Sequence, residues 1–373
     1  MLSCYCGETK KSDILFQINY TFLTNYDCVI LETVLGLNND HINLLSKLSV
    51  PRVVNAIRVQ WSFHYSKWVR RPVLKAQPIS ITIEPTTACN LGCPECPSGL
   101  KKFTRPEGNL KQDFYKKVID QTHQKSYYLN FYFQGEPFIN PNFLEMVSYA
   151  NAKNMYTATS TNAHFLNEKS AKKTIESGLS RLTISIDGTT QETYESYRKN
   201  GSLEKVIQGT KNVIKWKKEL KSKTPYIIFQ FLVVKPNEHQ IDDAKRLADE
   251  LGVDEIRFKT AQLYAYKHGN ALMPSIDKYS RYQKKADGTY RLKNKMLNEC
   301  WRMWSSCVIT WDGKVVPCCF DKDATHQLGE IEQQPLKDIW TSKGYNGFRK
   351  ALLTNRQEID ICQNCTEGTK VWE

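Results

Sequence analysis

Between residues 78 and 265, short runs of β-branched and aromatic residues alternate with longer amphipathic runs, and this alternation restricts the possible folds most. The strand-like runs are residues 79–84, 127–133, 155–160, 182–186, 226–234 and 255–259. Helix-like runs lie between them at residues 111–125, 141–153, 167–178, 203–221 and 238–251. Six β/α units in succession predict a parallel sheet, either open or closed into a barrel.

The loop after the first strand-like run holds three cysteines, Cys89, Cys93 and Cys96, in a C-x3-C-x2-C spacing. Thiolates this close along the chain can face one point, but the loop supplies no fourth ligand. Structural zinc sites fill all four coordination positions, so three cysteines alone fit zinc poorly. A [4Fe-4S] cluster held by three cysteines leaves one iron open to another ligand. The loop therefore predicts such a cluster, and a chance group of buried cysteines is the plainer alternative.

With this loop the sequence resembles the radical S-adenosylmethionine (radical SAM) family, whose cluster loop has the same spacing after the first barrel strand. The resemblance implies an α/β fold with a partial (β/α)6 TIM-like barrel. The cysteine loop then lies at the mouth, where the C-terminal ends of the strands meet. The resemblance also implies that the open iron binds SAM, whose reductive cleavage gives a 5′-deoxyadenosyl radical that abstracts hydrogen from a substrate.

The family's SAM contacts correspond to residues at the ends of the second, third and fourth strands. The implied residues are Gly135, Glu136, Ser160, Asn162, Ser185, Asp187 and Arg198. The glycine and glutamate match a Gly-Gly-Glu-Pro turn for the methionyl amino group, although Gln134 replaces the first glycine. The short polar side chains after the third strand suit ribose hydroxyls. Ser185 and Arg198 correspond to residues that hold the SAM carboxylate, a planar group that fits a guanidinium fork. Asp187 also fits a plain turn before a helix.

A second group of cysteines follows a polar, aperiodic stretch at 266–298, which is typical of a linker. Its members are Cys300, Cys307, Cys318, Cys319, Cys362 and Cys365. The segment WDGKVVPCC predicts two short strands joined at Asp312-Gly313, and the last two cysteines form a C-x2-C pair. Residues 299–373 resemble the SPASM/Twitch domain, which carries auxiliary clusters in many radical SAM enzymes. This resemblance implies a small C-terminal α+β auxiliary-cluster domain.

The second resemblance implies one auxiliary [4Fe-4S] cluster, because the C-x5-C-x3-C ligands of a full SPASM domain do not follow Cys365. The implied ligands are Cys300, Cys318, Cys362 and Cys365, with Cys307 as an alternative. Four thiolates that end in a C-x2-C pair also suit zinc, so zinc stays open on the residues of this region alone. The cysteine loop at residues 89–96 favours an iron-sulfur cluster over zinc for this second group as well.

Two further residues of this region are candidates for catalysis. Cys319 stands where sulfatase-maturing relatives carry an acidic base, and Asp321 follows two positions later. A thiol near the substrate could return a hydrogen atom to a product radical, as an epimerisation requires. The plainer alternative is a spare cysteine packed inside a small domain.

The chain carries a formal net charge of +13, which suggests an anionic partner, although solvated lysines on helix faces explain the excess equally well. No secretory signal begins the chain, so its cysteines predict a reducing cytoplasm rather than disulfides. The family resemblance implies a small-molecule, glycan or peptide substrate and an electron donor such as flavodoxin or ferredoxin. A non-catalytic zinc protein that binds nucleic acid is the competing hypothesis. It leaves the β/α units unexplained, so we do not expect nucleic acid as a partner.

Residues 1–77 form an N-terminal extension before the barrel at 78–265. A basic and aromatic stretch at 50–72 has apolar residues at helical spacing, namely Val53, Ile57, Trp61 and Tyr65. We expect a helix that packs across one end of the barrel. An interfacial helix on an anionic membrane is the alternative, which leaves a peripheral membrane contact open. Three cysteines without partner motifs are interpreted as free thiols: Cys4, Cys6 and Cys28.

Overall fold

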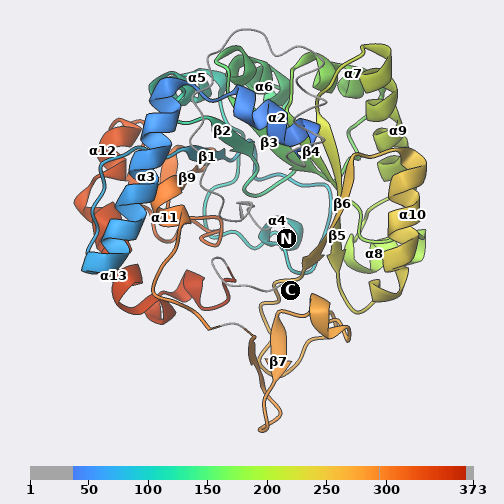
Figure 1. Ribbon diagram of the computed structural model, residues 1–373. Coiled ribbons are helices and arrows are strands. Elements are labelled where there is room, and N and C mark those ends of the chain that lie inside the picture. The colour runs from blue at the N-terminus through green and yellow to red at the C-terminus, as the bar shows by residue number, and fades with distance from the viewer. Residues whose placement is uncertain (1–36, 294, 367–373) are drawn as a thin grey trace.

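Six parallel strands form the centre of the computed structural model, which describes residues 37–293 and 295–366 (Figure 1). The strands are β1 (Ser80–Ile83), β2 (Tyr128–Phe131), β3 (Tyr156–Thr161), β4 (Arg181–Ser185), β5 (Tyr226–Val233) and β6 (Glu255–Thr260). Each pairs in parallel with the next along the chain. The partial (β/α)6 barrel is therefore confirmed. The cysteines interpreted as free thiols before residue 37 lie outside the described residues.

Helices cover the outer face of these strands (Figure 1). They are α5 (Gln112–Thr122), α6 (Phe143–Ala152), α7 (Glu168–Glu176), α8 (Gln191–Tyr197), α9 (Leu203–Glu219) and α10 (Ile241–Leu251). All but α8 were expected from the sequence. On β4, Leu182 and Ile184 pack in the main core with Ile175 of α7. Because strand side chains alternate, Thr183 and Ser185 point to the inner face of the barrel.

Strands from the C-terminal region extend the same sheet. β9 (Ser306–Ile309) pairs in parallel with β1, β10 (Lys314–Val316) is antiparallel to β9, and β11 (Gly329–Glu330) is antiparallel to β10. The helices of this region are α11 (Arg302–Ser305), α12 (Leu336–Trp340) and α13 (Lys343–Asn355). The predicted C-terminal domain thus continues the barrel sheet, which the sequence analysis did not foresee.

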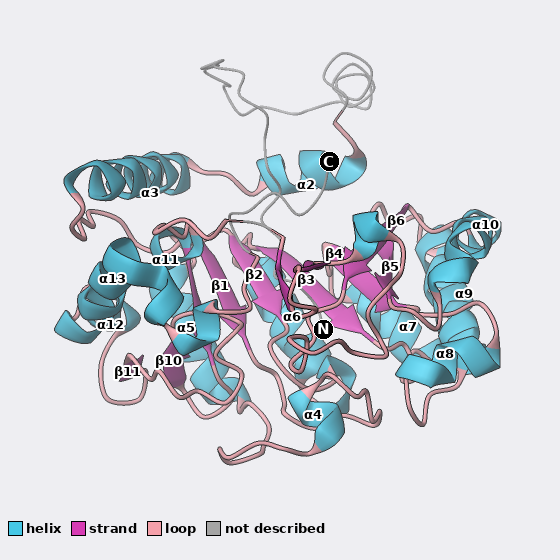
Figure 2. Ribbon diagram, turned by 90° about the horizontal axis from the view of Figure 1, so that it is seen from below, coloured by secondary structure: helices cyan, strands magenta, loops and turns pink. Residues whose placement is uncertain are grey.

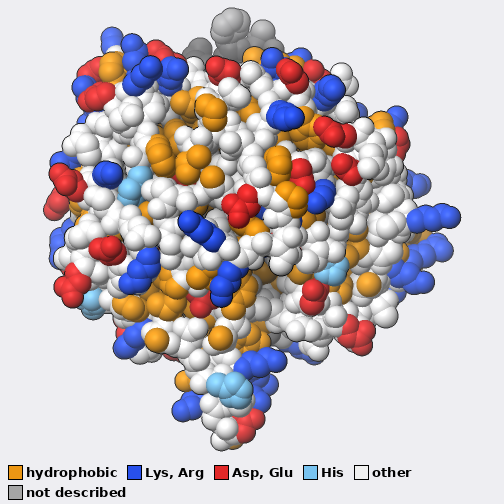
Figure 3. Space-filling model, turned by 180° about the vertical axis from the view of Figure 1, so that it is seen from behind, with side chains coloured by type: hydrophobic (Ala, Val, Ile, Leu, Met, Phe, Trp, Pro, Cys, Tyr) orange, Lys and Arg blue, Asp and Glu red, His pale blue; other side chains and the backbone are white. Residues whose placement is uncertain are grey.

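The stretch interpreted as a linker contains a hairpin. Strands β7 (Tyr282–Lys284) and β8 (Tyr290–Leu292) pair antiparallel to each other. This hairpin projects from the rest of the molecule (Figure 1), and Lys and Arg side chains gather on the projection (Figure 3). Its strands are three residues each, too short for their pattern to stand out from a polar sequence.

Two N-terminal helices, α2 (Asn39–Ser46) and α3 (Val50–Val69), lie over the N-terminal ends of the barrel strands (Figures 1 and 2). The buried carboxylate of Asp40 accepts a hydrogen bond from Tyr156 and pairs with Arg181, at the starts of β3 and β4. The guanidinium of Arg52 donates to the backbone carbonyl of His123 at 2.9 and 2.6 Å. These contacts confirm that α3 packs across the barrel end.

The predicted apolar stripe of α3 does not make this contact. The buried face of the helix consists of Arg52, Asn55, Val59, Ser62, Phe63 and Ser66. Val53, Ile57 and Trp61 are exposed. Polar side chains that bind backbone carbonyls thus hold much of the helix, and a periodicity of apolar residues does not reveal them. None of the helices within 37–293 and 295–366 is long and apolar enough to span a lipid bilayer.

Candidate functional site

The loop with Cys89, Cys93 and Cys96 follows β1 at the C-terminal end of the barrel and leads into the short helix α4 (Pro97–Leu100). Figure 2 shows α4 on the side of the strands away from α2 and α3. Burial raises the pKa of the Cys89 thiol to about 12, and Glu136 and the two other thiols add to this rise. The three sulfurs therefore lie close enough to interact.

Backbone packing fixes the shape of this loop. The amide of Gly92 donates to the carbonyl of Lys199 at 2.9 Å. A Cβ atom on Gly99 would lie 2.5 Å from the backbone nitrogen of Cys93, so only glycine allows this approach. The loop is thereby pressed between α4 and the segment after α8.

The donor set of this loop fits a cluster better than a single ion. Cys89, Cys93 and Cys96 are all in the thiol form, outside any disulfide. Among those residues no three His, Cys, Asp or Glu side chains converge closely enough to hold one metal ion. A [4Fe-4S] cluster takes one thiolate on each of three irons and leaves the fourth iron open to another ligand. Three neighbouring thiols therefore fit a cluster with one open iron.

Glu136 is buried at the C-terminal end of β2, beside the cysteine loop. Its carboxylate accepts hydrogen bonds from the Thr161 hydroxyl at 2.8 Å and from the Asn162 amide at 2.7 Å. Burial nevertheless raises its pKa to about 7, because desolvation outweighs these hydrogen bonds. A cationic group bound here would remove the cost of the charged form.

The turn before Glu136 requires glycine. Gly135 has a φ of +73°, and a Cβ atom there would lie 2.3 Å from the backbone oxygen of Thr86. Its amide donates to Ser98 Oγ of α4 at 2.9 Å. The turn is thus clamped between the start and the end of the cysteine loop. Gln134, which replaces the family's first glycine, is buried.

The polar residues after β3 also reach the cysteine loop. The side-chain amide of Asn162 donates to Asn90 Oδ1 at 2.8 Å and lies 4.0 Å from Cys89 Sγ. Ser160 is half-buried on β3, and Ser185 is buried as the last residue of β4. Asn162 therefore contacts the cysteine loop, while Ser160 and Ser185 lie on strands that end at the same mouth.

Arg198 and Asp187 form a buried ion pair at the same mouth. The guanidinium of Arg198 donates to Asp187 through Nε at 2.5 Å, and its Nη1 lies 3.7 Å from Cys93 Sγ. The other oxygen of Asp187 accepts from the Leu232 amide at 2.7 Å. Asp187 therefore orients Arg198 toward the cysteine loop, a function that the sequence analysis did not assign.

Four cysteines of the C-terminal region gather in a second group: Cys300, Cys318, Cys362 and Cys365. Burial, followed by nearby thiols of this group and Cys319, raises the pKa of Cys318 well above its usual range. Arg356 lies 3.4 Å from Cys365 Sγ and offsets part of the negative charge that thiolates bring. Cys307 is buried in β9, where the charged group acting on it is Arg349.

Cys319 and Asp321 differ in their surroundings. Cys319 packs against Phe133, Val308 and Val316, toward the end of β2. Asp321 is buried, and its carboxylate accepts hydrogen bonds from the backbone amides of the residues four and five positions later, at 2.8 and 2.9 Å. Both oxygens of Asp321 therefore stabilise a local turn, which is the geometry of a structural cap rather than of a free base.

A buried ion pair that the sequence analysis missed joins the two regions. Arg105 donates to both oxygens of Glu84, at 2.8 and 2.5 Å, directly after β1. It also donates to the carbonyl of Lys322 at 3.0 Å, while the amide of Trp311 donates to Glu84 at 3.2 Å. The available signal was a glutamate at a strand end, but nothing in the sequence marks Arg105 as its partner.

Comparison with known proteins assigns the family. The model of the radical SAM superfamily matches residues 83–248, and that of the SPASM iron-sulfur cluster-binding domain matches residues 300–366. The chain is a radical SAM enzyme with a SPASM domain. Its cofactors are therefore SAM, a [4Fe-4S] cluster that binds SAM, and an auxiliary iron-sulfur cluster in the SPASM domain. The hypothesis of a non-catalytic zinc protein is set aside.

This radical SAM enzyme is similar to proteins with several different names. It is 26% identical over 315 residues to the tungsten-containing aldehyde ferredoxin oxidoreductase cofactor-modifying protein of Pyrococcus furiosus, covering 76% of this chain and 86% of that protein. It is 26% identical over 297 residues to the AdoMet-dependent heme synthase of Methanosarcina barkeri, covering 70% and 82%. Streptococcus suis SuiB bound to its precursor peptide SuiA has a similar fold, with a TM-score of 0.56, 14% identity and coverage of 83% and 75%.

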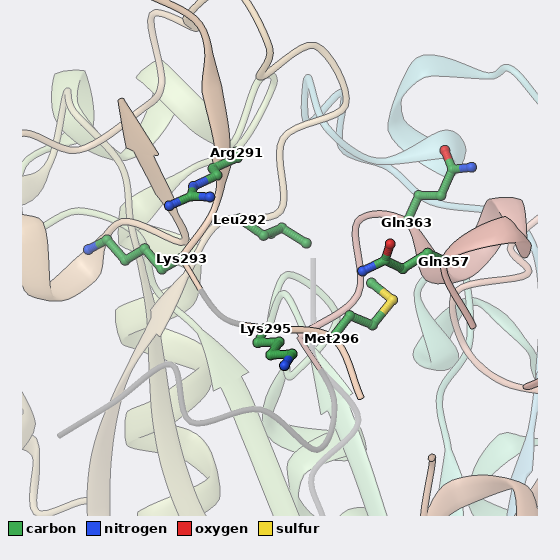
Figure 4. A pocket seen from close by; sticks show the side chains of 7 residues that line it. All are labelled: Arg291, Leu292, Lys293, Lys295, Met296, Gln357 and Gln363. Carbon is green, nitrogen blue, oxygen red and sulfur yellow. The ribbon is translucent and has the colours of Figure 1, made fainter. Parts of the chain in front are cut away.

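A cavity of about 590 Å³ lies outside this site in the radical SAM enzyme, between the β7–β8 hairpin and the C-terminal cysteine pair (Figure 4). Its lining residues are Arg291, Leu292, Lys293, Lys295, Met296, Gln357 and Gln363. None of them is a sequence-predicted SAM contact. The cavity is therefore basic and adjoins the Cys362–Cys365 pair through Gln363.

Proposed function

We propose that this radical SAM enzyme oxidises an unreactive C–H bond of a peptide or a small molecule at the mouth of the barrel. The relatives named above support a cofactor precursor or a peptide as the substrate class. A glycan is a further substrate class that the same C–H oxidation would accept. The observation that carries the proposal is the second group of four thiols, which offers a closed site for an electron acceptor next to the barrel.

Cys89, Cys93 and Cys96 would hold the SAM-binding cluster. When bound, this cluster supplies the electron that cleaves SAM into methionine and a 5′-deoxyadenosyl radical, which abstracts hydrogen from the substrate. The residues of the strand ends would hold SAM: Gly135, Glu136, Ser160, Asn162, Ser185 and Arg198.

The protein's own groups would position SAM through charge. The Glu136 carboxylate would accept hydrogen bonds from the ammonium group of SAM, which compensates its desolvation. Arg198 would face the carboxylate of SAM from the other side, held at its Nε by Asp187. Complementary charges on two strand ends therefore orient the methionyl part.

Cys300, Cys318, Cys362 and Cys365 would hold one auxiliary cluster, with Cys307 as the alternative ligand. Four protein thiolates leave no iron open, so this site would transfer electrons rather than bind substrate. A cluster held by these thiols would supply an acceptor for one electron of the substrate radical, and solvent or a base would take the proton. Arg356 would stabilise the thiolate charge of the site.

Epimerisation is the second candidate function, and the position of Cys319 favours it. Cys318 faces the other thiols, whereas Cys319 packs against Phe133 near the end of β2. There its S–H bond could break to give a hydrogen atom to a substrate radical, and the resulting thiyl would need an electron and a proton for the next turnover. Product analysis in D2O separates the two functions, because only an epimer gains solvent deuterium at unchanged oxidation state.

We further propose that an acidic electron donor such as flavodoxin or ferredoxin docks at the basic hairpin. Lys and Arg side chains surround the cavity of Figure 4 and the tip of the hairpin in Figure 3, which complements an acidic protein surface. Iron-sulfur clusters and the thiols that would hold them, such as Cys89, Cys93 and Cys96, are maintained in a reducing cytoplasm.

Anaerobic reconstitution tests the proposed cluster and SAM functions. The purified protein should bind iron and sulfide and should release 5′-deoxyadenosine when dithionite and SAM are added. Replacing Cys89, Cys93 and Cys96 together with alanine should abolish this release. Cys362→Ala should lower the iron content but retain much of the SAM cleavage. Release of 5′-deoxyadenosine by the triple variant would contradict the assignment of the first loop.

A further inference from the structure

Helix α3 presents an apolar stripe to solvent along its whole length. The stripe consists of side chains that recur at helical spacing: Val50, Val54, Ile57, Trp61 and Trp68. Trp68 is 79% exposed, Val50 75% and Ile57 58%. In the preceding helix α2, Leu45 is 46% exposed. So many large apolar side chains on one helix face mark an interaction surface.

The charges around this stripe are of one sign. The basic residues of 37–77 outside the buried Arg52 are Lys47, Arg58, Lys67, Arg70, Arg71 and Lys75. The one acidic residue of that segment, Asp40, is buried at the barrel end. From a packed neighbour, Glu299 pairs with Lys67 at 2.6 Å and neutralises that lysine. The remaining cations flank the apolar stripe.

The aromatic residues of the stripe are of the amphipathic kind. Trp61 stacks on Tyr65 with ring centroids 4.9 Å apart, and Tyr65 contacts Trp68 at 5.8 Å. The ammonium of Lys75 lies 5.5 Å from the Trp61 ring. Trp and Tyr prefer the headgroup region of a bilayer, where Lys and Arg reach lipid phosphates.

We propose that α2 and α3 dock this protein on an anionic lipid bilayer, with α3 in the plane of the headgroups and its apolar stripe among the acyl chains. The cations then bind lipid phosphates. A second copy of this chain fits the surface less well, because a symmetric contact would place the same cations against each other.

Docking in this way sets the orientation of the barrel. Asp40 and Arg52 attach the two helices to the N-terminal ends of the strands. The cysteine loop and α4 lie across the strands from α2 and α3 (Figure 2). The mouth therefore faces the aqueous side, so the enzyme would take a water-accessible substrate while attached to the membrane. This inference does not depend on the proposed chemistry.

Co-sedimentation of the reconstituted full-length protein with vesicles tests the proposal. The protein should bind equimolar phosphatidylglycerol–phosphatidylcholine vesicles, should bind phosphatidylcholine vesicles less, and should be released by salt. We expect Trp61→Ser/Trp68→Ser and Arg58→Glu/Arg71→Glu each to lower partitioning by about tenfold or more. Tryptophan fluorescence should shift to the blue on binding in the wild type.

A matched control keeps the test specific. Lys211→Glu and Lys218→Glu in α9, with Leu220→Ser at its C-cap, remove two cations and an exposed apolar side chain, and this variant should bind vesicles like the wild type. Iron content and dithionite-driven SAM cleavage report that every variant is folded. Absence of wild-type binding to anionic vesicles would overturn the proposal, as would equal losses in the control. Salt-sensitive binding of an acidic protein at this face without vesicle binding would assign the surface to a protein partner instead.

Discussion

Replacing Glu136 by glutamine should make the protein without SAM more stable at alkaline pH and yet weaken SAM binding. The Glu136 pKa rises from an ordinary value of 4.5 to about 7, mainly through burial. Because the folded state holds this proton more tightly than the unfolded state, the stabilisation is fully present below pH 4.5 and is lost as pH rises through about 7. The shift corresponds to about 3 kcal/mol.

Glutamine keeps the shape of the side chain but removes its charge. The oxygen of the glutamine side chain can accept from the backbone amide of Asn162, and its nitrogen can donate to the Thr161 hydroxyl. The weaker contact with the Phe138 amide at 3.3 Å would then face a donor, which costs about 1 kcal/mol. The net gain at pH above about 8 is therefore about 2 kcal/mol.

Binding of SAM has the opposite pH dependence. The ammonium group of SAM requires the ionised carboxylate, so wild-type affinity should fall about tenfold per pH unit below about 7. The Glu136→Gln variant should bind SAM about ten- to hundredfold more weakly at pH 8 and show no such slope.

Equilibrium dialysis with SAM and thermal unfolding, both from about pH 6 to 8.5, measure these effects on anaerobic protein. Glu168→Gln is the control, because Glu168 is a solvent-exposed partner of Lys215. Equal pH slopes in wild type and Glu136→Gln would refute the reasoning. Unchanged SAM affinity in the variant would refute the assignment of the ammonium site.

Three further changes test the turn at Gly135, the buried ion pair of Arg105 and the proposed docking of the electron donor. Gly135→Ala should lower the free energy of unfolding by about 3 kcal/mol or more and abolish SAM binding, because the new Cβ would lie 2.3 Å from a backbone oxygen. The control is Gly252→Ala, also at φ +73° but with open space around it, which should lower the free energy of unfolding by only about 1 kcal/mol. Arg105→Leu should lower stability in thermal unfolding by about 3–5 kcal/mol, because its carboxylate partner stays buried without compensation; a loss below about 1 kcal/mol would contradict this. Arg291→Glu/Lys295→Glu should slow reduction by flavodoxin in stopped-flow absorbance but leave reduction by dithionite unchanged, and equal slowing with both reductants would argue against docking there.

The strands and most helices could be predicted because local periodicity is enough to define them. The predicted strand at 226–234 and the observed β5, for example, differ by one residue. The helix α8 was missed because it is only seven residues long and polar. The cysteine loop and the Gly135–Glu136 turn were visible because their chemistry depends on spacing within the chain.

Contacts between distant segments were not predictable in the same way. Arg105 lies far along the chain from Trp311, and nothing local marks that both bind Glu84. The apolar residues of α3 were read as its packing face, whereas the helix is held by buried polar groups such as Arg52. Hydrophobic periodicity shows that one face of a helix is apolar, but not that the face is covered.

The pairing of β9 with β1 makes the two thiol sites parts of one rigid unit. Ile81 is in register with Cys307; β1 leads into the cysteine loop, and β9 leads through a turn into β10, which ends just before Cys318. Glu84 ties the ends of these strands together by binding Arg105 and Trp311. A change at this carboxylate should therefore disturb SAM cleavage and the auxiliary site together, whereas loss of a single auxiliary thiol should disturb only the second. The proposed electron transfer between the sites depends on this shared sheet, because adjacent paired strands hold their loops at a fixed separation.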